Sequence, residues 1–183
     1  MIQTIRKAWG IPELRKKILF TVFALLIFRL GSVVPVPFID SNMLGATLNN
    51  MGGIFTLLGA MNGTAFSMAA VFALGVQPYI NSSIIIQLLT VAIPALERLQ
   101  KEGGEEGRKK IAAITRYVTV AIGLLQGFGY YTLIRTQGGG TMLDTAGLPG
   151  WWAGIVIVLC FTAGSAFVMW LGEQITEFGI GNG

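Results

Sequence analysis

The chain consists of long apolar runs separated by short stretches rich in charge, glycine or proline. A bilayer core about 30 Å thick needs roughly 20 mostly apolar helical residues. The runs that reach or approach this length are therefore expected to cross a membrane. They cover residues 18–34, 72–93, 112–134 and 151–172. The pattern predicts an all-α, polytopic membrane helix bundle with four spanning helices.

The stretch between Asp40 and Glu97 contains no charged residue. It is too long for one span and too short for two complete spans with a connection, and pairs of Asn and Gly residues interrupt it. We therefore predict a short helix over residues 54–61 that re-enters the membrane, followed by the span at 72–93. Non-helical backbone at that depth needs protein or a watery cavity around it. This broken unit is the first indication of function.

The segment before that unit has its own start and stop signals. Pro35 and Pro37 are expected to end the first span. Asp40 or Ser41 is then expected to cap a short helix that runs through Met51.

The basic residues are concentrated in two places. Of the 13 Lys and Arg, all but Arg29 and Arg135 lie within residues 6–17 or 98–116. Basic clusters mark cytoplasmic segments, so the amino terminus and a charged loop over residues 94–111 are expected in the cytoplasm. The start resembles a signal peptide, but no small-residue cleavage site follows. We predict an uncleaved first span.

Composition narrows the function classes. Charged residues make up 12% of the chain, against about 25% in soluble domains. Histidine, the commonest metal ligand and general base, does not occur. The single Cys160 lies in an apolar run and reads as a small hydrophobic residue. These features argue against a zinc protease or a histidine-based hydrolase, and we expect no metal, no cofactor and no enzymatic activity.

One face of the span 72–93 carries a stripe of five residues at helical spacing. They are Val76, Ile80, Ser83, Gln87 and Thr90. The stripe is apolar at its outer end and polar toward the cytoplasm. Gln87 needs protein or water around its amide, and Thr119 and Gln126 on the next span are candidate partners. Ordinary interhelical hydrogen bonding explains such a stripe, and so does a polar funnel that narrows to an aliphatic constriction.

Four segments in order resemble one known family. They are residues 29–40, with Arg29-Leu30-Gly31 and Pro35-Val36-Pro37; residues 72–89, with Phe72-Ala73-Leu74-Gly75; residues 109–117, with Thr115-Arg116-Tyr117; and residues 170–183, with Trp170-Leu171-Gly172-Glu173. Together they resemble helices one to four of SecY, the central subunit family of the bacterial Sec translocation channel. The resemblance implies ten spanning helices in two inverted halves around a pore with a lateral gate. This chain corresponds to the amino-terminal half.

The resemblance also implies roles for particular residues. The aliphatic pore ring would include Val76 and Ile80. The lateral gate would include Asn81, Ile84, Gln87 and Gln126. The plug of the resting pore would be the short re-entrant helix, with Ile54, Phe55, Leu57, Leu58 and Met61. In the charged loop, Arg108, Lys109 and Lys110 are a weaker candidate surface for docking a partner. Two departures are that Val76 is often isoleucine in relatives and that Phe178 stands where relatives carry a basic residue.

The implied function is a protein-conducting channel subunit in the bacterial inner membrane. It would pass unfolded secretory polypeptides and release apolar segments sideways into membrane lipid. The implied partners are the SecE and SecG subunits, the SecA motor or a ribosome, and the missing carboxy-terminal half. Since the chain has no phosphate-binding loop, energy would come from the motor or ribosome.

Two other functions are alternatives for this sequence. Interrupted helices also build secondary transporters, although those sites usually carry ionisable groups at mid-membrane. An intramembrane aspartate enzyme is disfavoured because Asp40 and Asp144 fall in predicted outer loops. Glu173 and Glu177 are expected to lie at a solvated helix end. Arg29 is expected to reach the outer interface by extending its side chain, with a contact to an outer loop or the plug as the alternative.

Overall fold

The computed structural model describes residues 11–51, 53, 57, 60, 63–137, 143–144, 147 and 149–181. Within these ranges the chain forms helices and two isolated β-bridges. The helices are α2 (Pro12–Gly31), α3 (Ser41–Met51), α5 (Thr64–Ser67), α6 (Gln77–Ala92), α7 (Pro94–Lys101), α8 (Gly104–Gln137) and α9 (Gly150–Phe178). The prediction of an all-helical chain is confirmed for the described residues.

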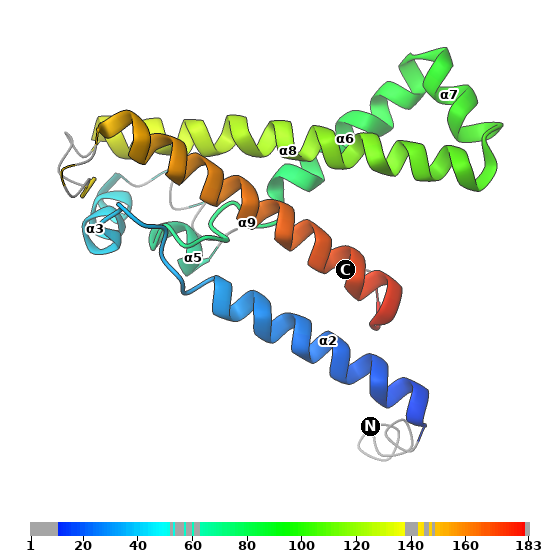
Figure 1. Ribbon diagram of the computed structural model, residues 1–183, viewed down its shortest axis with the longest axis horizontal. Coiled ribbons are helices and arrows are strands. Elements are labelled where there is room, and N and C mark those ends of the chain that lie inside the picture. The colour runs from blue at the N-terminus through cyan, green and yellow to red at the C-terminus, as the bar shows by residue number, and fades with distance from the viewer. Residues whose placement is uncertain are drawn as a thin grey trace.

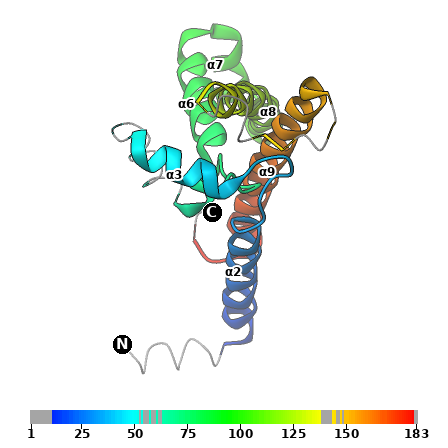
Figure 2. The ribbon, with the colours of Figure 1, turned by 90° about the vertical axis from the view of Figure 1, so that its left-hand side faces the viewer.

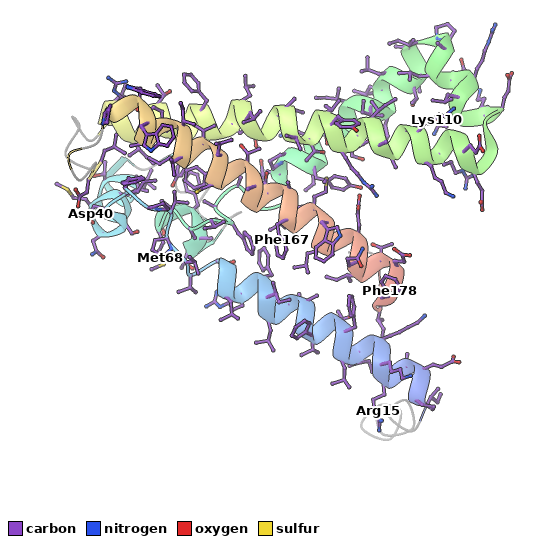
Figure 3. All side chains as sticks on the ribbon, in the orientation of Figure 1. Arg15, Asp40, Met68, Lys110, Phe167 and Phe178 are labelled. Atoms are coloured by element: carbon purple, nitrogen blue, oxygen red, sulfur yellow. The ribbon has the colours of Figure 1, made fainter. Side chains whose placement is uncertain are left out.

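The long helices lie roughly side by side, with α9 running between α8 and α2 (Figure 1). Figure 2, viewed nearly along α8, shows α6 and α7 on one side of α8 and α9 on the other. Figure 3 places Arg15, Lys110 and Phe178 toward one end of the long axis, and Asp40 and Met68 toward the opposite end. Residues from both basic clusters therefore lie at the same end of the helices.

Two described helices are long and apolar enough to cross a membrane, at residues 104–136 and 150–178. Helices α6 and α7 meet at a bend of 100°, and they would add a third span if they were counted as one broken helix. Helix α2 does not meet the same criterion. Its charged residues lie near both ends, so the uncharged run between Lys17 and Arg29 is short. Four spans are therefore not confirmed.

The helix boundaries follow from local chemistry. Asp40 Oδ1 accepts the backbone N–H groups of Asn42 (3.0 Å) and Met43 (3.3 Å), so Asp40 rather than Ser41 caps α3. Helix α6 begins at Gln77, five residues later than predicted, because residues 71–76 form turns and Gly75 has a φ of +54°. A positive φ suits glycine and ends regular helical backbone.

The predicted cytoplasmic loop over residues 94–111 is largely helical. Helix α7 and the first turns of α8 fill it, with the chain reversing at residues 102–104. Glycines allow the close approach: a Cβ on Gly107 would lie 1.9 Å from the carbonyl oxygen of Leu99. Helix α8 consequently runs far beyond the predicted span 112–134.

The buried core lies where α3, α5 and the turns before α6 meet α8 and α9. Its largest fully buried side chains include Phe161, Leu44 and Ile134. The buried Tyr130 hydroxyl donates to the carbonyl oxygen of Phe66, which satisfies a polar group that would be costly to bury unpaired. On α8, Gly123 lies against Thr162 and Ser165 of α9, as is common where membrane helices pack closely.

Candidate functional site

The turn before α6 and the first turn of that helix form the centre of the candidate site. Val76 is the N-cap residue of α6 and Ile80 lies one turn later, where its N–H donates to the Val76 carbonyl oxygen (3.1 Å). Both side chains remain exposed, Val76 at 41% and Ile80 at 51%. Two aliphatic side chains without a covering neighbour are thus presented from one end of α6.

Two cavities meet at Val76. The first, of about 480 Å³, is lined by Val76 and Ile80 together with Phe28 and Arg29 of α2 and with Ala60. Arg29 therefore faces a cavity beside the predicted pore ring, in addition to lying near a helix end as the sequence predicts.

The second cavity, of about 510 Å³, is lined by Val76 and Tyr79, by Arg116 of α8, and by Glu173 and Glu177 of α9. Because Val76 lines both cavities, it lies at their junction: the first also contains Ile80 and Arg29, and the second contains the charged Arg116 and Glu173. Sequence reasoning predicted the aliphatic residue but not the second compartment.

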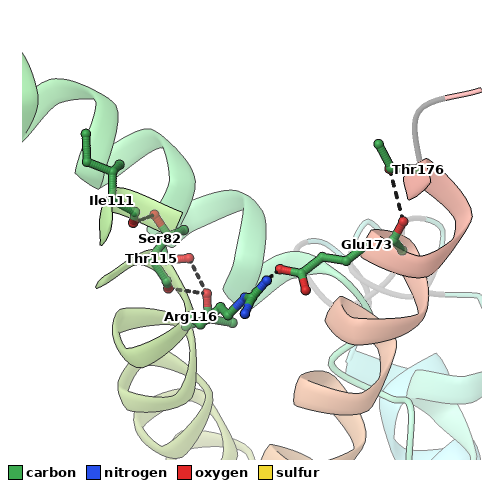
Figure 4. A network of polar contacts seen from close by, with 8 residues as sticks. Ser82, Ile111, Thr115, Arg116, Glu173 and Thr176 are labelled. Carbon is green, nitrogen blue, oxygen red and sulfur yellow. Dashed lines mark hydrogen bonds and ion pairs between the residues drawn. The ribbon is translucent and has the colours of Figure 1, made fainter. Parts of the chain in front are cut away.

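The charged wall is organised by an ion pair between α8 and α9. Arg116 Nε donates to Glu173 Oε1 at 2.9 Å (Figure 4). The Glu173 side chain is 28% exposed and the Arg116 side chain 54% exposed, so water reaches the pair and its energy is small, about 0.2–1 kcal/mol. The prediction that Glu173 lies at a solvated helix end is incomplete, because the ion pair between Glu173 and Arg116 also joins α9 to α8.

The predicted lateral-gate residues lie mostly together. Asn81 and Ile84 of α6 and Gln126 of α8 line one open groove of about 410 Å³. Gln87 is exposed farther along α6 and does not line that groove. Three of the four residues named from the sequence therefore share a surface at which an aliphatic wall carries two side-chain amides.

The predicted partner of Gln87 has a different contact. Thr119 Oγ1 lies 2.5 Å from Ser82 Oγ, and both residues are buried. The bond joins α6 to α8 through the buried face of α6, which also contains Ile86 and Thr90. Thr90 thus belongs to the packed face and not to the exposed stripe, because it follows the buried Ser82 and Ile86 at four-residue intervals along α6.

Most of the predicted plug lies outside the described residues. This applies to Ile54, Phe55, Leu58 and Met61. Leu57 is described and is 65% exposed.

The predicted docking residues Arg108, Lys109 and Lys110 are exposed on the first turns of α8, on a helix rather than a loop.

A set of aromatic contacts that the sequence did not predict ties α2 to the candidate site. The rings of Phe28 and Phe72 stack at 5.8 Å, and Phe72 stacks on Phe167 of α9 at 5.9 Å. Gly31 makes room for this arrangement, since a Cβ there would lie 2.1 Å from the Phe72 ring. The turn that carries Val76 is therefore held between α2 and α9.

At the other end of α2, Phe178 contacts Phe20 edge-on at 6.0 Å. The backbone N–H of Ile180 donates to Thr21 Oγ1 at 3.0 Å. Phe178, where the resemblance implies a basic residue, therefore makes an aromatic contact.

The sequence comparisons agree on a single family. The SecY family model matches residues 70–183. The chain is 42% identical over 193 residues to the protein translocase subunit SecY of Streptomyces coelicolor, covering 100% of this chain and 43% of that protein. It is 42% identical over 188 residues to the Thermus thermophilus subunit, covering 100% and 42%. It is 44% identical over 177 residues to that of Escherichia coli K12, covering 95% and 39%.

The chain belongs to the SecY family. It spans less than half the length of these relatives, and its match lies in their amino-terminal part. Together with the apolar helices, membership of the SecY family identifies a multi-pass membrane protein. Within the described residues, His, Cys, Asp and Glu side chains form no group of three or more that could hold a metal ion.

Proposed function

We propose that this chain forms the amino-terminal part of a protein-conducting channel that passes unfolded secretory polypeptides across the bacterial inner membrane. The observation that carries the proposal is the position of Val76, an exposed aliphatic residue that lines two adjoining cavities, one together with Ile80 and the other together with Arg116 and Glu173. The translocase relatives make a polypeptide the natural cargo.

In this proposal Val76 and Ile80 are part of an aliphatic ring that closes around the passing chain. Aliphatic side chains make no directional bonds, so they tolerate any sequence, and a narrow apolar passage excludes water and ions by dewetting. The cavity lined by Arg116 and Glu173 would be the wetted vestibule on the cytoplasmic side, with the amino terminus in the cytoplasm. Residues 54–61 would close the resting pore from the opposite side, since Ala60 of this segment lines the cavity that contains Val76 and Ile80.

The groove lined by Asn81, Ile84 and Gln126 would be one side of a lateral gate, with Gln87 farther along the same helix. An apolar segment in that gate gains by leaving for lipid, where each Leu or Ile at a helix centre contributes about −0.3 to −0.6 kcal/mol. The other side of the gate would come from the carboxy-terminal half, in line with the proposed ten-helix inverted-repeat architecture.

The proposal extends to partners and domains. Residues 1–183 would act as one half of the channel, associated with SecE and SecG. The exposed Arg108, Lys109 and Lys110 would dock the SecA motor or a ribosome, which supplies the energy. Conduction itself requires no bond chemistry from this chain.

Two measurements on the full-length protein in sealed vesicles test the function. With a motor and ATP, a secretory precursor should become protected from added protease, which a secondary transporter for small solutes would not achieve. Deleting residues 54–61 should raise ion leakage in the absence of precursor. Unprotected precursor would refute the channel, and unchanged leakage would refute the plug.

A further inference from the structure

An apolar groove lies between α8 and α9, separate from the surfaces described above. It has a volume of about 420 Å³ and lies toward the end of these helices that is remote from the basic clusters. Its main walls are Leu124, Phe128, Trp151, Ile155 and Leu159, and Arg135 completes it at one end. Both helices are long and apolar enough to cross a membrane.

The floor of the groove is fixed by one close contact. Gly154 lets the Tyr131 ring lie directly against α9, since a Cβ at residue 154 would be 2.7 Å from the Tyr131 Cζ atom. The Tyr131 hydroxyl donates to the carbonyl oxygen of Gly150 at 3.3 Å. In contrast, the walls are open: Phe128 is 61% and Leu159 54% exposed. The groove is therefore preformed and accessible.

The length of the groove matches one membrane leaflet. From Leu124 to Arg135 the rise along α8 is about 16 Å at 1.5 Å per residue. Half of a hydrocarbon core of about 30 Å is about 15 Å. One acyl chain laid along the groove would therefore extend from mid-membrane to the level of Arg135.

The end of the groove has the composition of a membrane interface with one positive charge. Trp151 is 65% exposed and contacts Trp152 edge-on, and tryptophan is enriched at headgroup level. Arg135 is exposed in the last turn of α8. Neither the Lys101–Glu97 pair nor the Arg116–Glu173 pair involves Arg135.

We propose that this groove binds an anionic phospholipid in the leaflet opposite the basic clusters. One acyl chain lies between α8 and α9, and the phosphate accepts hydrogen bonds from the Arg135 guanidinium, whose planar fork suits phosphate oxygens. The charge distinguishes this surface from an ordinary lipid-facing one. A site for anionic lipid on this side is independent of the pore proposal, because it involves neither Val76 nor the gate groove.

The test places a photoreactive p-benzoylphenylalanine at Phe128 in the full-length protein. The protein is reconstituted in phosphatidylcholine vesicles that contain a minor share of phosphatidylglycerol, and the lipid adducts are identified by mass. One basic residue near a membrane surface is worth about 1 kcal/mol, so phosphatidylglycerol should be enriched about fivefold over its share in the vesicle. Arg135→Gln should remove the enrichment and Arg135→Lys should keep most of it.

Two control variants distinguish the effect of the Arg135 charge on lipid binding from the effect of the groove's shape. Arg98→Gln removes an equal charge near the other end of α8 and should leave the enrichment at residue 128 unchanged. Ile155→Trp fills the groove and should lower the total lipid adduct. The proposal is overturned if wild-type adducts contain the two lipids in vesicle proportion, if Arg135→Gln retains the enrichment, or if the probe forms adducts with a protein segment instead. If the Arg135→Gln variant does not insert into the membrane, the enrichment of phosphatidylglycerol in the wild-type adducts decides by itself whether the proposal holds.

Discussion

Replacing Gly164 by alanine is expected to destabilise the protein by displacing the turn that carries Val76. Gly164 lies on α9 against the backbone of residue 71, and a Cβ there would be 2.0 Å from the Val71 carbonyl oxygen. Contacts below 3.0 Å essentially do not occur for real Cβ atoms. The alanine methyl group therefore requires a shift of about 1 Å between α9 and the turn.

The turn cannot make that shift freely. Val71 N–H donates to the Val34 carbonyl oxygen and Val36 N–H to the Ala69 carbonyl oxygen, each at 2.9 Å. Overpacking of this kind costs about 1–3 kcal/mol, and alanine recovers about 0.5–1 kcal/mol through its better helix propensity. The expected net loss is about 0–2.5 kcal/mol, and relative to a glycine-to-alanine change without the close contact it is about 1–3 kcal/mol.

The assay is denaturant unfolding of the full-length protein in mixed micelles, with Gly129→Ala as the matched control. Gly129 lies on α8 with no atom within 4 Å of its Cβ position, so alanine there should be neutral or stabilising. If Gly164→Ala is as stable as Gly129→Ala, the close contact between α9 and the turn is not as described and the reasoning fails.

Two further predictions concern polar contacts between helices. A double-mutant cycle of Ser82→Ala and Thr119→Val should give a coupling of about 0.6 kcal/mol, typical of membrane proteins, because each hydroxyl also reaches a carbonyl of its own helix; a coupling above about 2 kcal/mol would contradict this. A cycle of Arg116→Gln and Glu173→Gln should give less than about 1 kcal/mol and weaken as salt is added. A salt-independent coupling would mean that the pair is shielded from water.

Much of the fold follows directly from local sequence. The cap at Asp40 was predictable because an aspartate before a helical segment accepts its free N–H groups. The part of α9 over residues 151–172 was predictable because no charged residue interrupts its apolar run. Basic residues indicated which helix ends share a side, and Figure 3 shows Arg15 and Lys110 toward the same end.

Features that depend on close packing were not predictable. Helical periodicity placed Val76 inside a helix, but the positive φ of Gly75 delays the start of α6. Gly103 and Gly107, near the point where the chain reverses between α7 and α8, predicted a loop from the sequence. In the structure they allow the backbone of α8 to pack closely against Leu99 of α7. The pair between Arg116 and Glu173 joins residues that are far apart in sequence, so no local pattern indicated it.

Cysteine crosslinking tests most directly whether Val76 and Ile80 face a passing polypeptide. A stalled secretory chain would be engaged by the full-length protein with Cys160 replaced by alanine and a single cysteine at residue 76, 80 or 155. Ile155 is the control, because it is similarly exposed but lies on the groove between α8 and α9. The account predicts adducts from residues 76 and 80 and none from residue 155. The proposed pore position of Val76 and Ile80 would be contradicted if neither residue 76 nor residue 80 formed adducts, or if residues 76, 80 and 155 formed them equally.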